Sequence, residues 1–281
     1  MKTWKKIVLG VSLISLFLGG GLVAWGYSQG GLTDLQNQTK SEQDYVKKEV
    51  EDFYKIDIKS SSYNVLIKNG DVDKATLSYY QKTKNPIDTS VKDGQLTIND
   101  NNSELDSTSN KHINFFGLKD LVRLSTLNKE VRNKTIVIPL PKKQTIDFLK
   151  VDLATGNLDL SNSTIKQADI HLNVGDLTFT KMIVSNLKAN LDVGSVDSDH
   201  TLFTNSDLSI AMGDYSGDNL IFNGHNKLDV TSGDIEIALK DYTLNVQADS
   251  HSGEGDITNN LKISKDNTLT ITSDLGDITV E

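Results

Sequence analysis

Apolar and polar residues alternate along most of the C-terminal half of the chain, and each run of alternation contains a glycine. In residues 170–179, IHLNVGDLTF, alternate residues from Ile170 to Val174 are apolar, a Gly-Asp pair follows, and the alternation resumes at Leu177 and Phe179. Alternation with a period of two directs every second side chain to the same face of a strand. The segment therefore predicts two short strands that meet at a glycine corner, with their apolar side chains facing inwards.

The same pattern recurs down the chain, with spacings of 19, 19, 19, 20, 22 and 21 residues between successive corner glycines. One such unit cannot bury its apolar face alone, whereas units stacked one strand spacing apart form a continuous core. Glycine reaches positive φ at a tight corner, and a following Asp, Asn or Ser can bond the local backbone. The predicted structural corner positions are Gly156, Gly175, Asp176, Gly194, Gly213, Asp214, Gly233, Asp234, Gly255, Asp256, Gly276 and Asp277.

A period near 20 residues predicts an all-β fold, a parallel β-solenoid, for residues 53–281. Smaller apolar clusters between the copies predict further short strands that close each coil. The alternative is a β-sandwich of hairpins, because Gly-Asp is also hairpin chemistry. Ahead of the regular repeats, looser copies predict a hairpin at Val91–Ile98 (VKDGQLTI) and a strand at Thr135–Leu140 (TIVIPL), whose Pro139 should lie near an edge or a strand end.

An irregular insert, residues 99–134, interrupts this rhythm. Its first part is rich in Asn, Asp and Ser and predicts a loop. In its second part the apolar residues are spaced so that a short helix could gather them on one side. We interpret the insert as a cover over the core, and the alternative is a patch that contacts a membrane or a partner. The residues of that candidate contact patch are Phe115, Phe116, Leu118 and Leu121.

The N-terminal region predicts export. Residues 1–6 form a short basic tail, and residues 7–27 are an uncharged run long enough for a helix to span the hydrocarbon layer of roughly 30 Å. Lysines before this run predict a single-pass protein of the cell membrane with a cytoplasmic N-terminus and an extracellular C-terminal domain. The alternative is a secreted protein with a cleaved signal peptide, although Trp25 interrupts the best cleavage triplet. Residues 28–52 are polar and predict a solvated stalk; a short helix over 41–52 is less favoured.

The charge of the exported part is strongly acidic. Without the three lysines of the N-terminal tail, 26 basic residues face 38 acidic ones, a net charge of −12. Such a surface favours cationic partners and disfavours nucleic acid, whose binding needs basic residues on the phosphates. The chain contains no cysteine, which excludes disulfides, thiolate metal sites and a Cys nucleophile.

No motif in the sequence points to catalysis or to a cofactor. The histidines form neither H-x-H nor H-E-x-x-H, and nucleophile-elbow and phosphate-loop glycine patterns are absent. A stacked row of corner aspartates could hold Ca²⁺, but the nine-residue period and the glycine doublet of calcium-binding repeats are missing, which favours a structural role. We therefore predict no catalytic, cofactor-binding or metal-binding residues and no enzyme; a solenoid that cleaves polysaccharides is the less favoured alternative.

The pattern from residue 53 to residue 281 resembles a known family. The opening at Ile56–Ile67, the VKDGQLTI hairpin, the TIVIPLP strand and the train of V-G-D, S-G-D and L-G-D turns are similar to the bacterial β-strand-repeat family of candidate adhesins, LiaG-like proteins that include the C-terminal domain of LiaX. The resemblance implies an exported domain of the Gram-positive cell envelope, associated with envelope stress and with the response to cationic antimicrobial peptides. It implies no catalytic residue and no binding motif.

From these observations we expect a non-catalytic, membrane-anchored extracellular protein that binds cationic peptides or a membrane signalling protein. The alternative is a surface adhesin or structural module that binds a glycan or a protein along its repeat face. The sequence leaves the oligomeric state open. We expect a specific contact to lie first of all in residues 99–134.

Overall fold

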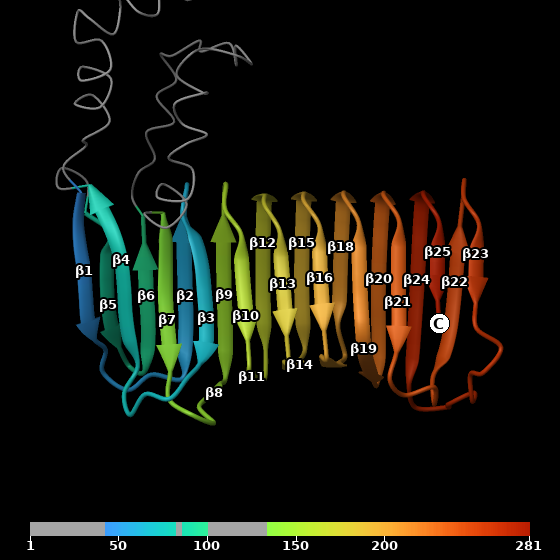
Figure 1. The fold of residues 1–281 in the computed structure, drawn as a ribbon, viewed down its shortest axis with the longest axis horizontal. Helices are drawn as coiled ribbons and strands as arrows, with labels where there is room; N and C mark the ends of the chain where they lie inside the picture. Colours follow the sequence, from blue (N-terminus) through green and yellow to red (C-terminus); the bar gives the residue numbers. More distant parts are fainter. Residues whose placement is uncertain (1–42, 83–85, 101–133) are drawn as a thin grey trace, which may run out of the picture. The chain divides into compact units, whose positions relative to one another are not determined.

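Strands of the regular repeats stack in parallel, one coil upon the next, in the computed structural model of the chain (Figure 1). The structure describes residues 43–82, 86–100 and 134–281, of which Asp44–Glu281 form one unit. Within these residues every regular element is a strand, and none is a helix. Accordingly, the described part of the chain holds no helix long and apolar enough to cross a membrane. The predicted span, residues 7–27, lies outside it.

Three faces surround the core. The first face is a ten-stranded sheet, in the spatial order β22 (Asn245–Ser250), β24 (Thr268–Leu275), β20 (His225–Ser232), β18 (Asp207–Met212), β15 (Leu187–Val193), β12 (Ala168–Val174), β9 (Phe148–Leu153), β2 (Lys55–Ser60), β6 (Gln95–Asn99) and β5 (Asp88–Lys92).

The second face begins with β1 (Gln43–Glu49), β4 (Thr76–Lys82), β7 (Thr135–Leu140) and β3 (Asn64–Asn69). It continues with β10 (Leu158–Ser161), β13 (Leu177–Thr180), β16 (Val196–Asp199), β19 (Tyr215–Asn223), β21 (Ile235–Leu239), β25 (Ile278–Val280) and β23 (Gly255–Ile257). The short third face holds β8 (Thr145–Ile146), β11 (Thr164–Ile165), β14 (Ile183–Ser185), β17 (Leu202–Thr204) and the second half of β19.

Strand register confirms the coil period. Leu158 pairs with Leu177, Leu177 with Val196, and Val196 with Tyr215, so that each step of 19 residues brings an apolar side chain above its counterpart. All these pairings are parallel, which agrees with a β-solenoid-like fold and not with a sandwich of hairpins. The predicted hairpin is also present, because β5 and β6 pair in antiparallel fashion around Asp93 (φ 50°) and Gly94 (φ 71°). Pro139 occupies the next-to-last position of β7, near a strand end as predicted.

One continuous apolar core runs through all the coils. Its inward positions are those of the alternation, and an aromatic column formed by Phe179, Phe203 and Phe222 passes through three successive coils with ring centroids 5.3 and 5.8 Å apart. Stacking equivalent side chains in this way gives each inner coil two neighbours against which to bury its apolar face.

The coils are not stacked in the order of the sequence at either end. β2 pairs with β6 on one side and β9 on the other, so the N-terminal coil lies inside the stack. Likewise β24 pairs with both β20 and β22, and β25 with both β21 and β23. The C-terminal coil is therefore inserted between two coils that precede it in the sequence.

Two expectations need correction. The range predicted as a stalk, 28–52, contains β1, which is the neighbour of β4 at the end of the second face, and Val50 is buried. The polar appearance of this segment is explained by its place at a sheet edge, where one flank is exposed. Val174 is also not an inward residue: its side chain is 48% exposed, because β12 reaches past the core edge before the glycine corner.

Candidate functional site

The glycine corners are the most regular feature of the surface. At Gly156, Gly175, Gly194, Gly213, Gly233 and Gly276 the φ angles lie between 140° and 149°. Gly194 shows why no larger residue fits, since a Cβ built there would lie 2.0 Å from the carbonyl oxygen of Gly175 in the next coil. The corners therefore approach each other backbone to backbone, as the sequence predicted for a structural turn.

The residue after each corner glycine joins a hydrogen-bonded ladder. Asp234 N–H donates to Asp214 Oδ1 at 2.9 Å, and Asp277 N–H donates to Asp234 Oδ1 at the same distance. Asn157 and Ser195 stand where other coils have aspartate, and both are members of the same row. We call the whole set the corner ladder; its members in spatial order are Asn64, Asn157, Asp176, Ser195, Asp214, Asp234, Asp277 and Glu254.

Gly255 and Asp256 do not form a corner, contrary to the prediction. Both lie in β23, where Gly255 pairs with Ile278 and has nothing within 4 Å of an added Cβ. The corner position belongs to Gly253, whose added Cβ would lie 2.1 Å from Gly276 O. The sequence SGEGD offers two glycines, and the strand register selects the first. Glu254, Gly253 and Asn64 are thus site residues that the Gly-Asp motif alone could not reveal.

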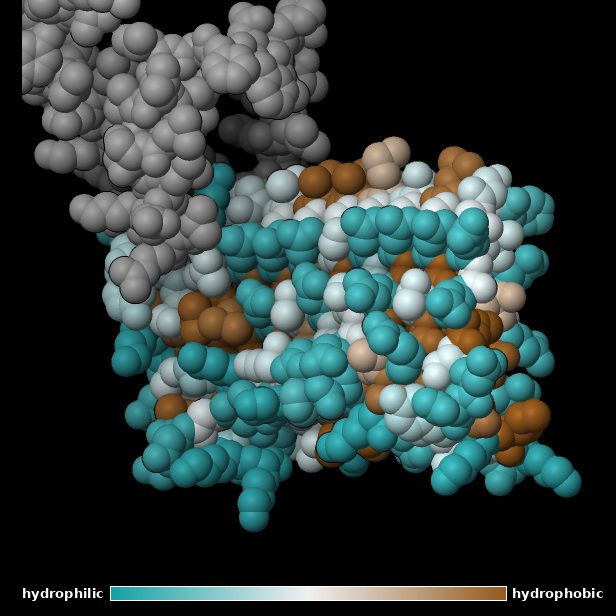
Figure 2. Space-filling model, turned by 45° about the vertical axis from the view of Figure 1, so that its right-hand side comes forward, coloured by the Kyte–Doolittle hydropathy of each residue, from teal (hydrophilic) through white to brown (hydrophobic). Residues whose placement is uncertain are grey.

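A row of exposed apolar side chains runs beside the corner ladder. Val174 pairs in register with Val193, Val193 with Met212, Met212 with Ser232, and Ser232 with Leu275. Their side chains are 48% (Val174), 42% (Val193), 59% (Met212) and 56% (Leu275) exposed. We call these four apolar residues the corner ridge. In Figure 2 hydrophobic side chains are exposed along the upper edge of the repeats, above a row of hydrophilic ones.

The strands of the second face carry no basic residue in the regular repeats. Strands β10, β13, β16, β19, β21, β25 and β23 contain no Lys, Arg or His. Along its outward column acidic and hydroxyl side chains alternate in register: Asp159, Thr178, Asp197, Ser216, Glu236, Thr279 and Asp256. Partial desolvation raises the pKa of Asp159, a hydrogen bond from Thr178 opposes this, and nearby Asp176 adds to the rise. This face attracts cations.

The first face differs, because charges of opposite sign alternate along its outward column. In register these are Asp57, Lys150, Asp169, Lys188, Asp207 and Lys227. Each charge therefore has opposite charges as its neighbours, and opposite-charge pairs across strands are mildly stabilising. Charges balance within this column, whereas the outward column of the second face from Asp159 to Asp256 carries acids and no basic residue.

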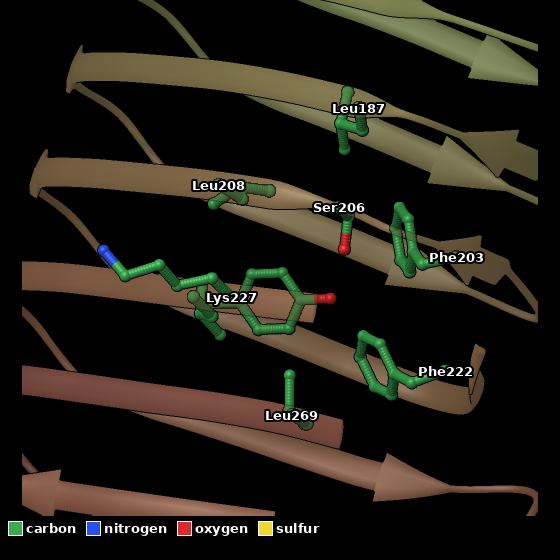
Figure 3. Close-up of a pocket in the computed structure, with 9 residues that line it drawn as sticks. Leu187, Phe203, Ser206, Leu208, Phe222, Lys227 and Leu269 are labelled. Atoms are coloured by element: carbon green, nitrogen blue, oxygen red, sulfur yellow. The ribbon is translucent and has the colours of Figure 1, made fainter. Parts of the chain in front are cut away.

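A small cavity lies among core residues of the regular repeats. This cavity of about 10 Å³ lies among Phe203, Phe222, Leu187, Leu208 and Leu269 (Figure 3). Such a volume is about that of one water molecule. In Figure 3 the Lys227 amine points away from the aromatic side chains. The buried Tyr215 hydroxyl, whose pKa is raised by its burial, also belongs to this wall.

A small polar cluster projects from the second face. The ligand atoms of Asp199, His200 and Asp218 lie within 4.8 Å of one another, and His200 Nδ1 is 2.6 Å from Asp199 Oδ1. Asp218 Oδ2 accepts a hydrogen bond from Asn219 Nδ2 at 2.7 Å. Asp199 and His200 are hydrogen-bonding partners of each other, and Asp218 is bonded to Asn219. His200 and Asp218 are exposed. The sequence prediction of no metal-binding residue thus stays a prediction.

The contact patch predicted at Phe115, Phe116, Leu118 and Leu121 lies outside the described residues. The geometry at the corner, in contrast, assigns the predicted aspartates a definite role: Asp176, Asp214, Asp234 and Asp277 each use a carboxylate oxygen as the acceptor for the N–H of the neighbouring coil. We expected these side chains to bond their own local backbone, whereas they bond the backbone of the neighbouring coil.

Several solved structures of bacterial proteins are similar to this chain. A candidate cell adhesion protein from Clostridium sporogenes has 16% identity and a TM-score of 0.40 over 85% of this chain and 99% of the other. A candidate adhesin from Bacteroides fragilis has 14% identity and a TM-score of 0.37, covering 86% and 98%. One from Parabacteroides distasonis has 14% identity and a TM-score of 0.38, covering 85% and 98%. Likeness at this level carries no conclusion about partners.

Among curated proteins none matches the chain. The family model of Toastrack DUF4097, by contrast, matches residues 53–281, which comprise the hairpin, the glycine corners and all the stacked coils. The resemblance inferred from the repeat pattern is confirmed over the same range. The chain therefore belongs to the Toastrack DUF4097 family.

Proposed function

We propose that this protein is a non-catalytic binding module of the cell envelope, held outside the membrane by residues 7–27, whose acidic second face binds cationic peptides or a basic segment of a membrane partner. The observation that carries the proposal is the composition of that face, whose strands from β10 to β23 have acidic and hydroxyl side chains and no Lys, Arg or His. A surface of one sign raises the local concentration of oppositely charged ligands and speeds their association.

The small size of the cavity among the core strands supports a non-catalytic role. The described cavity is about 10 Å³, far below the 300 Å³ or more that is typical of small-molecule sites. The corner aspartates hold backbone N–H groups, the acids of the outward column from Asp159 to Asp256 alternate with hydroxyl residues, and the neighbouring pair Asp199 and Asp218 lies at the surface with Asp218 exposed. None of these arrangements isolates a carboxylate pair from water, as glycoside hydrolysis requires of its general acid.

A binding titration tests the electrostatic proposal. The full chain in nanodiscs of zwitterionic lipid is titrated with a labelled cationic peptide at increasing salt, with empty discs as the blank. We expect affinity to fall as salt rises from about 50 to 500 mM, because counterions screen exposed charges. A neutral peptide of the same length is the control. Absence of binding at low salt, or binding that does not respond to salt, would contradict the proposal.

Membrane anchoring is tested separately. We expect the full-length protein to sediment with membranes and to need detergent for release, since residues 7–27 are long and apolar enough to span a bilayer. A mature form in the culture medium that begins near Tyr27 would instead establish signal cleavage and secretion.

Deletion of the gene is expected to change the sensitivity of the cells to cationic antimicrobial peptides.

An adhesin or structural module is the second candidate. It is favoured by the length of the flat, in-register faces, whose outward columns extend over many coils. Binding of the full chain to a glycan or matrix protein that persists at high salt would favour this function over the electrostatic one.

A further inference from the structure

We propose that the corner ridge, formed by Val174, Val193, Met212 and Leu275, is the docking site for an amphipathic helix with cationic flanks. The inference rests on the proposed function, because it names the place where the cationic partner binds. It is carried by a feature that the fold itself does not require, namely a column of exposed apolar side chains beside a row of acids.

The fold tolerates a polar residue at the ridge position. Ser232 occupies the same column, in register with Met212 on one side and Leu275 on the other. Thr155 similarly precedes Gly156, as Val174 precedes Gly175. The coils of Thr155 and Ser232 have the same glycine corner and the same ladder as the coils with an apolar ridge residue. The four apolar ridge residues are therefore not needed to form the corner. Their exposure leaves apolar surface in water, and an exposed patch of this kind in a register-aligned row marks an interaction site.

Acidic side chains border the ridge on both sides. Asp192 and Asp274, both exposed, precede ridge residues in the sequence, and the corner ladder with Asp176, Asp214, Asp234 and Asp277 follows them. The five ridge segments contain no Lys or Arg: residues 173–177, 192–196, 211–215, 231–235 and 274–278. The charge around the ridge therefore complements a cationic ligand and repels an anionic lipid surface or nucleic acid.

The spacing of the ridge suits a helix that lies along the stack. Adjacent strands are about 4.8 Å apart, so the column from Val174 to Leu275, four strand spacings long, extends about 19 Å. An α-helix advances about 5.4 Å per turn, so about 13 residues cover this distance and offer one apolar side chain per turn. Lysines on the two flanks of that helix would reach Asp192 and Asp274 on one side and the acids of the corner ladder on the other.

A second copy of the chain does not fit this surface. Two ridges placed face to face would bring their acidic rows together, and like charges directly opposed are unfavourable. The four side chains also fall well short of the roughly 800 Å² per partner that stable protein interfaces bury. A short cationic helix avoids the charge repulsion.

The test uses an amphipathic Leu/Lys peptide of about 14 residues, titrated by fluorescence anisotropy against the full chain in zwitterionic nanodiscs. The ridge variant is Val193→Ser with Met212→Ser, which copies the residue already found at Ser232. The matched control is Ile183→Ser, because the exposure of Ile183, 48%, lies between those of Val193 and Met212 but the residue belongs to the third face. We expect the ridge variant to weaken binding by about tenfold or more, and the control to stay within about twofold.

The outcomes separate this inference from the function on which it rests. If the wild-type chain fails to bind any cationic peptide at low salt, the proposed function falls, and the docking site with it. If it binds with the expected salt dependence but the ridge variant binds equally well, only the docking site is overturned. A melting temperature of the ridge variant close to that of the wild type establishes that lost binding is not lost folding.

Two further variants test the charge and the occupant. Asp192→Asn with Asp274→Asn should weaken peptide binding at low salt and make the affinity depend less on salt. No change in either quantity would contradict the role of these acids.

The chain carries basic and apolar residues of its own in residues 111–134. Replacing residues 101–133 by a short Gly-Ser linker should leave affinity unchanged. A rise of about tenfold would overturn the proposal, since it would mean that the chain occupies its own ridge.

Discussion

Asp214 Oδ1 accepts a hydrogen bond of 2.9 Å from the backbone N–H of Asp234, which lies 20 residues later in the chain and one coil further along the stack. The carboxylate thus bonds the backbone of the neighbouring coil and not that of its own turn. A Gly-Asp pair is common as a local turn, where the Asp side chain bonds its own backbone. Here the same pair joins neighbours, so the motif stabilises the stack and not the individual corner.

The ladder predicts different effects of two substitutions at Asp214. Asp214→Ala removes the acceptor of the Asp234 N–H and should lower the free energy of unfolding by about 1 kcal/mol. Asp214→Asn keeps an acceptor oxygen, as Asn157 does at the same position, and should cost much less. Chemical denaturation of the two variants measures both values. Equal losses would mean that the carboxylate charge, and not the hydrogen bond, is what matters.

The corner glycines predict a steric effect that depends on position. Gly194→Ala places a Cβ about 2.0 Å from Gly175 O at a φ of 145° and should destabilise the fold by about 2 kcal/mol or more. The matched control is Gly255→Ala, where nothing lies within 4 Å of the added atom. We expect its unfolding free energy to change by no more than about 0.5 kcal/mol. A large loss at Gly255 would indicate that the corner is there after all.

The raised pKa of Asp159 predicts that replacing this residue stabilises the protein by an amount that depends on pH. Desolvation raises its pKa in the folded state, so folding favours the protonated form. Its contribution is therefore fully present below the unfolded pKa and is lost as pH rises through the folded pKa. Asp159→Asn should raise the melting temperature at about pH 7 and have a smaller effect at about pH 3. Destabilisation of similar size at both pH values would instead assign the larger share to the hydrogen bond with Thr178.

The alternating column of the first face predicts an electrostatic penalty. Lys188→Glu would place three carboxylates in a row, since Lys188 lies in register between Asp169 and Asp207. We expect a loss of about 1 kcal/mol, relieved in part by 1 M salt, whereas Lys188→Gln should lose less than half as much. Thermal melts at low and high salt provide the measurement. A penalty that is insensitive to salt would point to lost packing of the lysine stem.

Much of this architecture follows from the sequence because the solenoid repeats one local pattern. Alternation around Ile170 and Leu172 fixes which side chains face inwards, and the spacing of Gly156, Gly175 and Gly194 fixes the length of a coil. These features are local, and each coil of the stack repeats them. The hairpin turn at Asp93-Gly94 could be predicted for the same reason, because positive φ at both residues suits that dipeptide.

The remaining features depend on register between distant segments. Nothing in SGEGD distinguishes Gly253 from Gly255 until β23 is paired with β25. Val174 continues the alternation of Ile170 and Leu172, and only the position of the core edge leaves it exposed. β1 is polar along most of its length, so its place beside β4 left no periodic signal. In each case the deciding contact is made with a neighbouring coil and not along the chain.

The inserted C-terminal coil has a consequence for biosynthesis. Because the ribosome makes the chain N-terminus first, β20 and β22 exist before β24, the strand that must lie between them. Until residues 268–280 are complete, both strands present unpaired edges that match the same missing strand. A chain stalled or clipped at this stage is therefore expected to present two open strand edges to other chains, which favours intermolecular strand pairing and aggregation. Residues 268–280 thus decide whether these edges are paired within the chain or stay open to other molecules.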